Sequence, residues 1–155
     1  MKRAEKGFTL IELLVVILII SILAVTVFVA LNPVKRFRDA RDARRWSDVD
    51  TILTAIHEYV VDNGGSLPAG LDTTEKQLGT DATGCNATAC TTPPAAAACL
   101  DLSTSLAPYL KKIPQDPNGG TPGKTYYKVV RDSNNIVTVS ACASEGSGVL
   151  LSVSR

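Results

Sequence analysis

The stretch Gly7-Phe8-Thr9-Leu10-Ile11-Glu12-Leu13 opens the segment that decides the fold of this chain. A short leader with three basic residues and one acid precedes it, and an uncharged apolar run follows from Leu13 to Leu31. A helix rises about 1.5 Å per residue, so this run reaches about 28 Å, close to the thickness of a bilayer core. The sequence therefore predicts one membrane-spanning helix near the N-terminus.

The basic leader, the Gly7–Phe8 junction, the acid at Glu12 and the uninterrupted apolar run occur together. This combination resembles the class III signal of type IV pilins and of type II secretion pseudopilins. The resemblance implies that a prepilin peptidase cuts between Gly7 and Phe8 and that Phe8 is then N-methylated. An ordinary secretory signal differs, because it is cut after its apolar stretch.

Glu12 is the one acid at the edge of the apolar run, where an ionised group is costly and requires a partner. The implied cleavage would create an ammonium group at Phe8, one helical turn away, and the two charges can offset each other's desolvation. The resemblance assigns this pair to the incoming subunit during filament assembly. The alternative is an interfacial carboxylate that reaches the lipid headgroups.

Four cysteines lie beyond the apolar run, at Cys85, Cys90, Cys99 and Cys142. An even number in a small domain indicates two disulfides and an oxidising compartment. Three pairings are open, of which we favour Cys85–Cys90 with Cys99–Cys142. A zinc site is the alternative, but the spacings are not paired C-x₂-C knuckles and no histidine lies nearby.

The chain is predicted to have an α+β fold of the type IV pilin kind, with one long N-terminal helix packed on a small antiparallel sheet. Asn32-Pro33 should kink this helix without ending it. Apolar residues then recur at spacings of three and four, which predicts a helix face packed on the head: Trp46, Val49, Leu53, Ile56 and Val60. The predicted divisions are a leader at 1–7, a transmembrane helix at 8–31, an amphipathic half-helix at 32–63 and a head at 64–155.

The head divides into a disulfide-stapled loop at 64–100 and a region of short helix and strands at 101–155. The loop is rich in small residues and includes a short helix expected around 74–78 and a glycosylation sequon at 86–88. A short helix is expected within 101–110. Three strands should follow as a meander, at 125–130, 136–142 and 149–153.

Tyr109 to Pro117, with Tyr126-Tyr127, resembles the segment before the sheet in the major pseudopilin of type II secretion. That family carries an aspartate-rich calcium loop near the C-terminus. Here Ala143 to Gly148 offers only Glu145, too few hard oxygen ligands for a calcium site. We therefore expect no metal and no cofactor, and the pilus and secretion branches stay open.

Basic residues crowd the far flank of the apolar run, which by the positive-inside rule would place the head in the cytoplasm. The class III signal and the cysteines predict the opposite orientation, with the head outside the inner membrane and later in an extracellular or periplasmic filament. The basic cluster could touch anionic lipid or DNA, but its interleaved aspartates favour a solvated face, and no nucleic-acid partner is assigned. Its members are Lys35, Arg36, Arg38, Arg41, Arg44 and Arg45.

The predicted function is that of a structural filament subunit in a pilus or in type II secretion, and no enzymatic activity is expected. The sole histidine, His57, has no catalytic partner in the sequence, and neither a triad nor a phosphate loop is found. The implied partners are copies of the chain itself, a prepilin peptidase, an inner-membrane assembly platform and, before assembly, membrane lipid. The alternative is an envelope binding module or enzyme that uses the helix only as an anchor.

Overall fold

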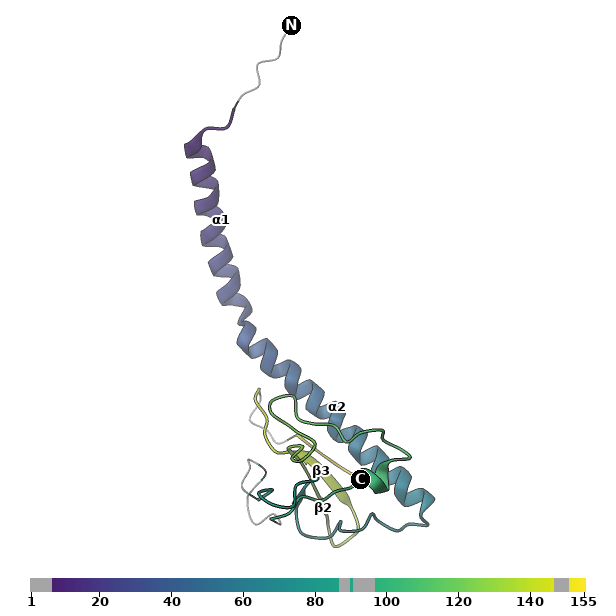
Figure 1. Cartoon of the computed structure of the whole chain (residues 1–155). Coiled ribbons are helices and arrows are strands. Elements are labelled where there is room, and N and C mark those ends of the chain that lie inside the picture. Colours follow the sequence, from purple (N-terminus) through teal and green to yellow (C-terminus); the bar gives the residue numbers. More distant parts are fainter. Residues whose placement is uncertain (1–6, 87–89, 91–96, 147–150) are drawn as a thin grey trace. The chain divides into compact units, whose positions relative to one another are not determined.

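The computed structural model describes residues 7–86, 90, 97–146 and 151–155 (Figure 1). The chain divides into two compact units, Met1–Phe37 and Arg38–Arg155. Several predictions fall wholly or partly outside the described residues. They concern the leader up to residue 6, parts of the loop at 64–100 with the sequon positions 87 and 88, the last two residues of the segment 143–148, and the first two residues of the strand expected at 149–153.

Two helices follow each other with one residue between them. Helix α1 spans Leu10–Leu31 and helix α2 spans Pro33–Asp62. Asn32 takes the left-handed conformation, with φ 40° and ψ 69°, and its side-chain oxygen accepts a hydrogen bond from the Lys35 amide at 3.3 Å. Proline suits the first position of a helix, where its missing N–H would have no intrahelical partner. The helix thus resumes directly, which confirms the predicted local interruption.

The sheet is an antiparallel meander of four strands in the order β1-β2-β3-β4. Its strands are β1 (Lys76–Gln77), β2 (Tyr127–Arg131), β3 (Val137–Ala141) and β4 (Ser152–Ser154). At its centre Val129 pairs with Val139, and Val139 pairs with Val153. The predicted α+β class is confirmed, with one strand more than expected.

The additional strand lies where a short helix was expected, around residues 74–78, so that prediction is wrong. The Asp72 carboxylate accepts a hydrogen bond from the Thr74 amide at 2.7 Å, which closes a turn before β1. The Leu78 amide then donates to the Tyr127 carbonyl at 2.8 Å. Pairing with a distant strand has therefore overridden the local preference of this segment. The other short helix, expected within 101–110, is present as α3 (Ser103–Leu106).

The core of the second unit lies between α2 and the sheet, and Figure 1 shows β2 and β3 beside this helix. Val49, Leu53 and Ile56 are fully buried, as the helical periodicity predicts. Burial of each such side chain stabilises the fold by about 1.5–3 kcal/mol. Tyr127 from β2 is also fully buried, and its hydroxyl donates to the Asp48 carboxylate at 2.8 Å. Burial and this hydrogen bond both raise the pKa of Tyr127.

One member of the predicted helix face is misplaced. Trp46 is 46% exposed, whereas its neighbour Arg45 is 1% exposed. Arg45 lies four residues before Val49 and seven before Ile52, on the same helical face. A charged residue is buried there because three carboxylates of the second unit surround it, a tertiary arrangement that hydrophobic periodicity does not register.

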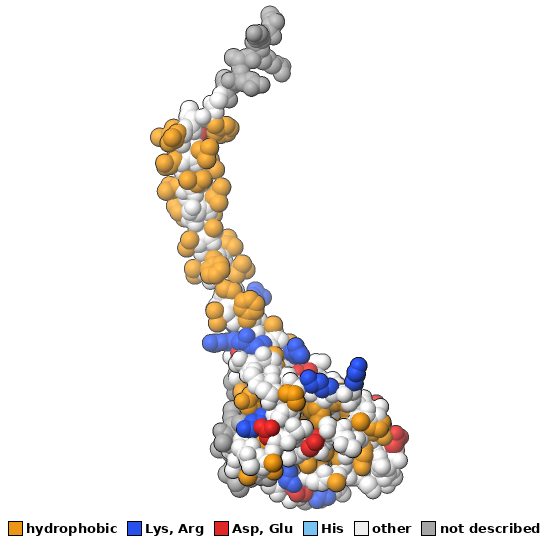
Figure 2. Space-filling view, in the orientation of Figure 1, with side chains coloured by type: hydrophobic (Ala, Val, Ile, Leu, Met, Phe, Trp, Pro, Cys, Tyr) orange, Lys and Arg blue, Asp and Glu red, His pale blue; other side chains and the backbone are white. Residues whose placement is uncertain are grey.

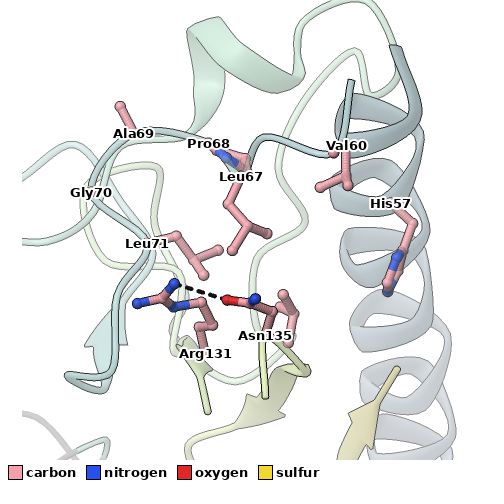
Figure 3. A pocket seen from close by; sticks show the side chains of 11 residues that line it. His57, Val60, Leu67, Pro68, Ala69, Gly70, Leu71, Arg131 and Asn135 are labelled. Atoms are coloured by element: carbon pink, nitrogen blue, oxygen red, sulfur yellow. Dashed lines mark hydrogen bonds between the residues drawn. The ribbon is translucent and has the colours of Figure 1, made fainter. Parts of the chain in front are cut away.

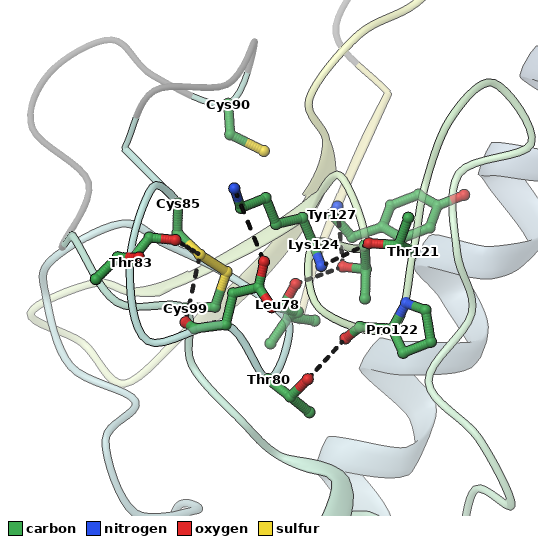
Figure 4. Close-up of a disulfide and its surroundings, with 12 residues drawn as sticks. Leu78, Thr80, Thr83, Cys85, Cys90, Cys99, Thr121, Pro122, Lys124 and Tyr127 are labelled. Carbon is green, nitrogen blue, oxygen red and sulfur yellow. Dashed lines mark hydrogen bonds and ion pairs between the residues drawn. A yellow bond between two sulfur atoms is a disulfide. The ribbon is translucent and has the colours of Figure 1, made fainter.

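Two disulfides link the loop region of the head, but the pairing we favoured is wrong. Cys85 is bonded to Cys99, and Cys90 is bonded to Cys142. The first bond closes a local loop (Figure 4). Within this loop the Cys99 amide also donates to the Asp81 carbonyl at 2.9 Å. The second joins the loop to the residue just after β3. Since all four cysteines are in disulfides, no cysteine thiolate is left to bind zinc, as the alternative would require.

Candidate functional site

The segment from Gly7 to the first turn of α1 carries the predicted processing and assembly residues. Gly7 is exposed, and a β-carbon placed on it would meet no atom within 4 Å. Phe8 is 82% exposed. Both residues therefore precede the helix in an accessible stretch, and Glu12 follows within the first helical turn.

Glu12 is held by Thr9 in a reciprocal capping box. Its Oε2 atom accepts hydrogen bonds from the Thr9 amide at 2.9 Å and from the Thr9 hydroxyl at 2.8 Å. The Glu12 amide in turn donates to the Thr9 hydroxyl at 3.3 Å. The carboxylate also lies at the positive end of the helix dipole, which favours its charge.

Sequence reasoning missed Thr9, although a signal for it was present. A Ser or Thr followed three residues later by Glu, directly before an apolar run, is typical of a capping box. Thr9 and Glu12 have this spacing. In the uncleaved chain the partner of Glu12 is thus Thr9, and the predicted pairing with a free amine at Phe8 concerns the processed chain.

Helix α1 is apolar on all sides, and none of its residues is buried. Its large apolar side chains are between 45% and 81% exposed. Figure 2 shows apolar side chains around the helix, with the carboxylate at its start. An apolar surface of this extent is unstable in water and requires lipid or another protein surface to cover it.

Among the described residues, one helical stretch, Leu10–Asp62, is long and apolar enough to cross a membrane, with a mean hydropathy of 3.3 in its most apolar window. This criterion rests on length and composition, which a signal sequence near the N-terminus also meets. The apolar half of this stretch is α1, in agreement with the membrane-spanning segment predicted from the sequence.

The second unit contains an ion-pair cluster around the buried Arg45. Its guanidinium binds both oxygens of Asp116, at 2.6 and 2.9 Å. It also donates to Asp42 at 2.7 Å and to Glu145 at 2.7 Å. Arg41 donates from Nε to Glu145 at 2.9 Å. We call Arg41, Asp42, Arg45, Asp116 and Glu145 the Arg45 cluster.

The cluster sets the ionisation of its acids. Hydrogen bonds from Arg41 and Arg45 lower the pKa of Glu145 to about 2. Burial raises the pKa of Asp42, but the hydrogen bonds from Arg45 and from the Gly146 and Glu145 amides outweigh it and leave the pKa lowered. Glu145 and Asp42 therefore stay charged at neutral pH.

The C-terminal loop contributes Glu145 to this cluster. Glu145, the one acid where the related family has a calcium loop, is bound by two arginines. In the part of the chain that the structure describes, no group of three or more His, Cys, Asp or Glu side chains could hold a metal ion. The positively charged group that lies among these carboxylates is the guanidinium of Arg45.

Comparison with known protein families gives a match for the N-terminal region, which contains Gly7, Phe8 and Glu12. Residues 2–28 match the family of the prokaryotic N-terminal methylation motif. Neither the curated proteins nor the solved structures gave a match. The match covers the predicted class III signal and supports a type IV pilin-like N-terminal segment in this chain. The motif implies a structural protein that is processed by a prepilin peptidase, assembles into a filament and is anchored in a membrane.

Proposed function

We propose that the chain is a structural subunit of a type IV pilus-like filament. A prepilin peptidase cuts it between Gly7 and Phe8, and Phe8 is N-methylated. Before assembly α1 is stored in the inner membrane with the head outside, where the two disulfides are stable. An assembly platform then moves the subunit into the filament, which serves either a pilus or type II secretion.

The observation that carries this proposal is the fully exposed apolar surface of α1. The second unit has its own core, so α1 is not needed to complete it. Lipid covers such a helix at no cost, and contact with the same helix of other subunits covers it equally well. A helix of this kind suits a subunit that leaves the bilayer for a helical bundle.

Glu12 gives the bundle its specificity. Among the described residues no cation forms an ion pair with its carboxylate, which has only the Thr9 hydrogen bonds. Cleavage supplies an ammonium group at Phe8 on every subunit. A carboxylate on one subunit and an ammonium on a neighbour favour one register of the helices, because any other register leaves both charges in an apolar surrounding.

The sharpest test is Glu12→Gln, since glutamine at this position retains the capping box but lacks the charge. We expect this variant to insert into the membrane, to be processed at Gly7 and to enter filaments at least about tenfold less than the wild type, the effect of losing one charge-assisted contact. Immunoblots of sheared filaments and of membrane fractions measure the distribution.

Thr9→Ala is the matched control. It removes the hydroxyl cap, which weakens the start of the helix by about 1 kcal/mol, and leaves the Glu12 charge in place. Its assembly should stay close to that of the wild type. Wild-type assembly of Glu12→Gln would refute the charge pair and favour the alternative, in which α1 only anchors a binding module or enzyme.

A further inference from the structure

An open cavity of about 460 Å³ lies in the second unit, between the end of α2, the segment after it and the turn from β2 to β3 (Figure 3). This volume is within the range of small-ligand pockets, roughly 300–1,000 Å³. Its position is independent of α1 and of the processing segment. We call it the Arg131 cavity, after the one charged residue in its wall.

Arg131 brings a cation to this cavity. Its Nη1 atom donates to the Asn135 side-chain oxygen at 2.9 Å, whereas its Nε atom is buried without a hydrogen-bond partner. Among the described residues no acid forms an ion pair with it. The two acids nearest in sequence have other contacts: Asp72 binds Lys76 at 2.7 Å, and Asp132 accepts the Asn134 and Ile136 amides at 2.8 Å each.

His57 supplies a second polar atom. It extends from α2 beside the cavity, and its Nε2 atom is buried without a hydrogen-bond partner (Figure 3). Buried polar atoms in native proteins are nearly always hydrogen-bonded, so these two atoms are exceptions. Both are closed off from solvent, so a ligand in the cavity would meet the Arg131 guanidinium at its terminal nitrogens.

The rest of the wall includes four buried or half-buried apolar side chains. Val60 comes from α2, Leu67 and Leu71 from the segment after it, and Val137 from β3. Leu71 and Val137 are buried and belong to the core of the unit, so this wall is preformed. A cation beside a rigid apolar wall suits a ligand that has an anionic end and an apolar body.

We propose that the Arg131 cavity binds an organic carboxylate with a short apolar chain. The guanidinium donates to the carboxylate through its terminal nitrogens. The apolar chain lies along Leu67 and Leu71. The carboxylate belongs either to a free small acid or to the C-terminus of a peptide, since both offer this chemistry.

The test uses the full chain in lipid nanodiscs at constant pH. His57 is the only histidine, so its ring gives one assignable NMR signal that reports on this cavity. Butanoate is titrated against butanamide, which has the same shape without the charge. We expect butanoate to shift the His57 signal with at least about tenfold higher affinity, because charge-assisted hydrogen bonds are the stronger ones. Equal affinities, or no shift with either compound, would overturn the proposal.

A peptide pair separates the two sources. Acetyl-Ala-Ala-Leu with a free C-terminus is compared with the same peptide amidated. If the peptide with a free C-terminus binds more tightly than butanoate, the ligand is a peptide C-terminus. If it binds more weakly than butanoate, the ligand is a small acid. Inorganic phosphate has no apolar part and should bind least. Tightest binding of phosphate would refute the role of the apolar wall.

Arg131→Gln should lower the butanoate affinity at least about tenfold. Arg44→Gln is the matched control, because it makes the same change in charge on a side chain that is 66% exposed and outside the cavity. Unchanged affinity in Arg131→Gln would contradict the proposal. If Arg131→Gln fails to fold, the comparison of butanoate with butanamide in the wild type still shows whether the cavity binds a carboxylate.

Discussion

At the scale of single residues, Arg45 contributes most to the arrangement of the head. Its guanidinium joins α2 to Asp116 and to Glu145, which follow it by 71 and 100 residues in the chain. Arginine suits this place because its planar fork of donors binds a carboxylate through two parallel hydrogen bonds. The bidentate contact with Asp116 has this geometry. Removal of the arginine would leave three carboxylates close together with too little positive charge.

We therefore predict that Arg45→Met lowers the free energy of unfolding by about 3–5 kcal/mol, the cost of leaving a buried charge without its partner. Urea unfolding of the full chain in nanodiscs measures this change through Trp46, the only tryptophan. Arg44→Met is the control, because it alters an exposed side chain and should change stability by less than about 0.5 kcal/mol. Equal stability of the two variants would show that the cluster contributes nothing.

At the scale of elements, the meander has short outer strands and depends on covalent support. β1 has two residues and β4 has three. The disulfide from Cys90 to Cys142 joins the loop region to the end of β3 across 52 residues of chain, and the disulfide from Cys85 to Cys99 closes 14. In the chain-entropy account a longer closed loop gives more stabilisation. The expected values are about 4 kcal/mol for the disulfide from Cys90 to Cys142 and about 3 kcal/mol for the disulfide from Cys85 to Cys99.

The pairing itself is testable with Cys142→Ser. We expect this variant to lose about 4 kcal/mol of stability and to expose one thiol, at Cys90. Maleimide labelling of the folded protein followed by fragment-ion mass spectrometry locates the thiol. A label on Cys99 would support the pairing that we favoured from the sequence and contradict the structure. Arg44→Met, with all four cysteines retained, should take up no label.

At the scale of the whole molecule, the chain joins a unit made for an apolar surrounding to a unit with a water-exposed surface. The basic residues near their junction are partly neutralised, since Arg41 and Arg45 bind carboxylates and Arg44 lies 3.8 Å from Asp48. These ion pairs leave unchanged the count of Lys and Arg on which the positive-inside rule depends, so the proposed external head rests on the class III signal and on the disulfides. In the function that we propose, processing decides whether the whole chain stays a precursor or enters a filament.

Gly7→Val tests that step. A β-carbon at this position meets no other atom within 4 Å, so we expect the substitution to leave both units folded and to act on recognition by the peptidase. We expect an intact mass that includes residues 1–7 and no methyl group at Phe8. Ala30→Val, which adds apolar bulk within α1, should be processed normally. A processed and methylated Gly7→Val protein would contradict the cleavage site.

The periodicity of the sequence was sufficient to predict the apolar helix, the amphipathic stretch with Val49, Leu53 and Ile56, and the strands around the turn at Asn134-Asn135. These features depend on interactions between residues near each other in the chain. The processing motif was predictable for the same reason, because a peptidase recognises a continuous segment. The capping box of Thr9 and Glu12 was equally local and was overlooked.

Only the tertiary structure decided the strand at Lys76–Gln77, the burial of Arg45 in place of Trp46, the disulfide partners and the Arg131 cavity. Each depends on groups far apart in the sequence: Arg131 and His57, for example, line the same cavity although 74 positions of the chain separate them. Hydrophobic patterning reports how a segment distributes its apolar side chains, and it contains no information on which distant carboxylate, thiol or backbone carbonyl will meet them. The sequence by itself determined a membrane helix with a processing motif, whereas packing determined the chemistry of the head.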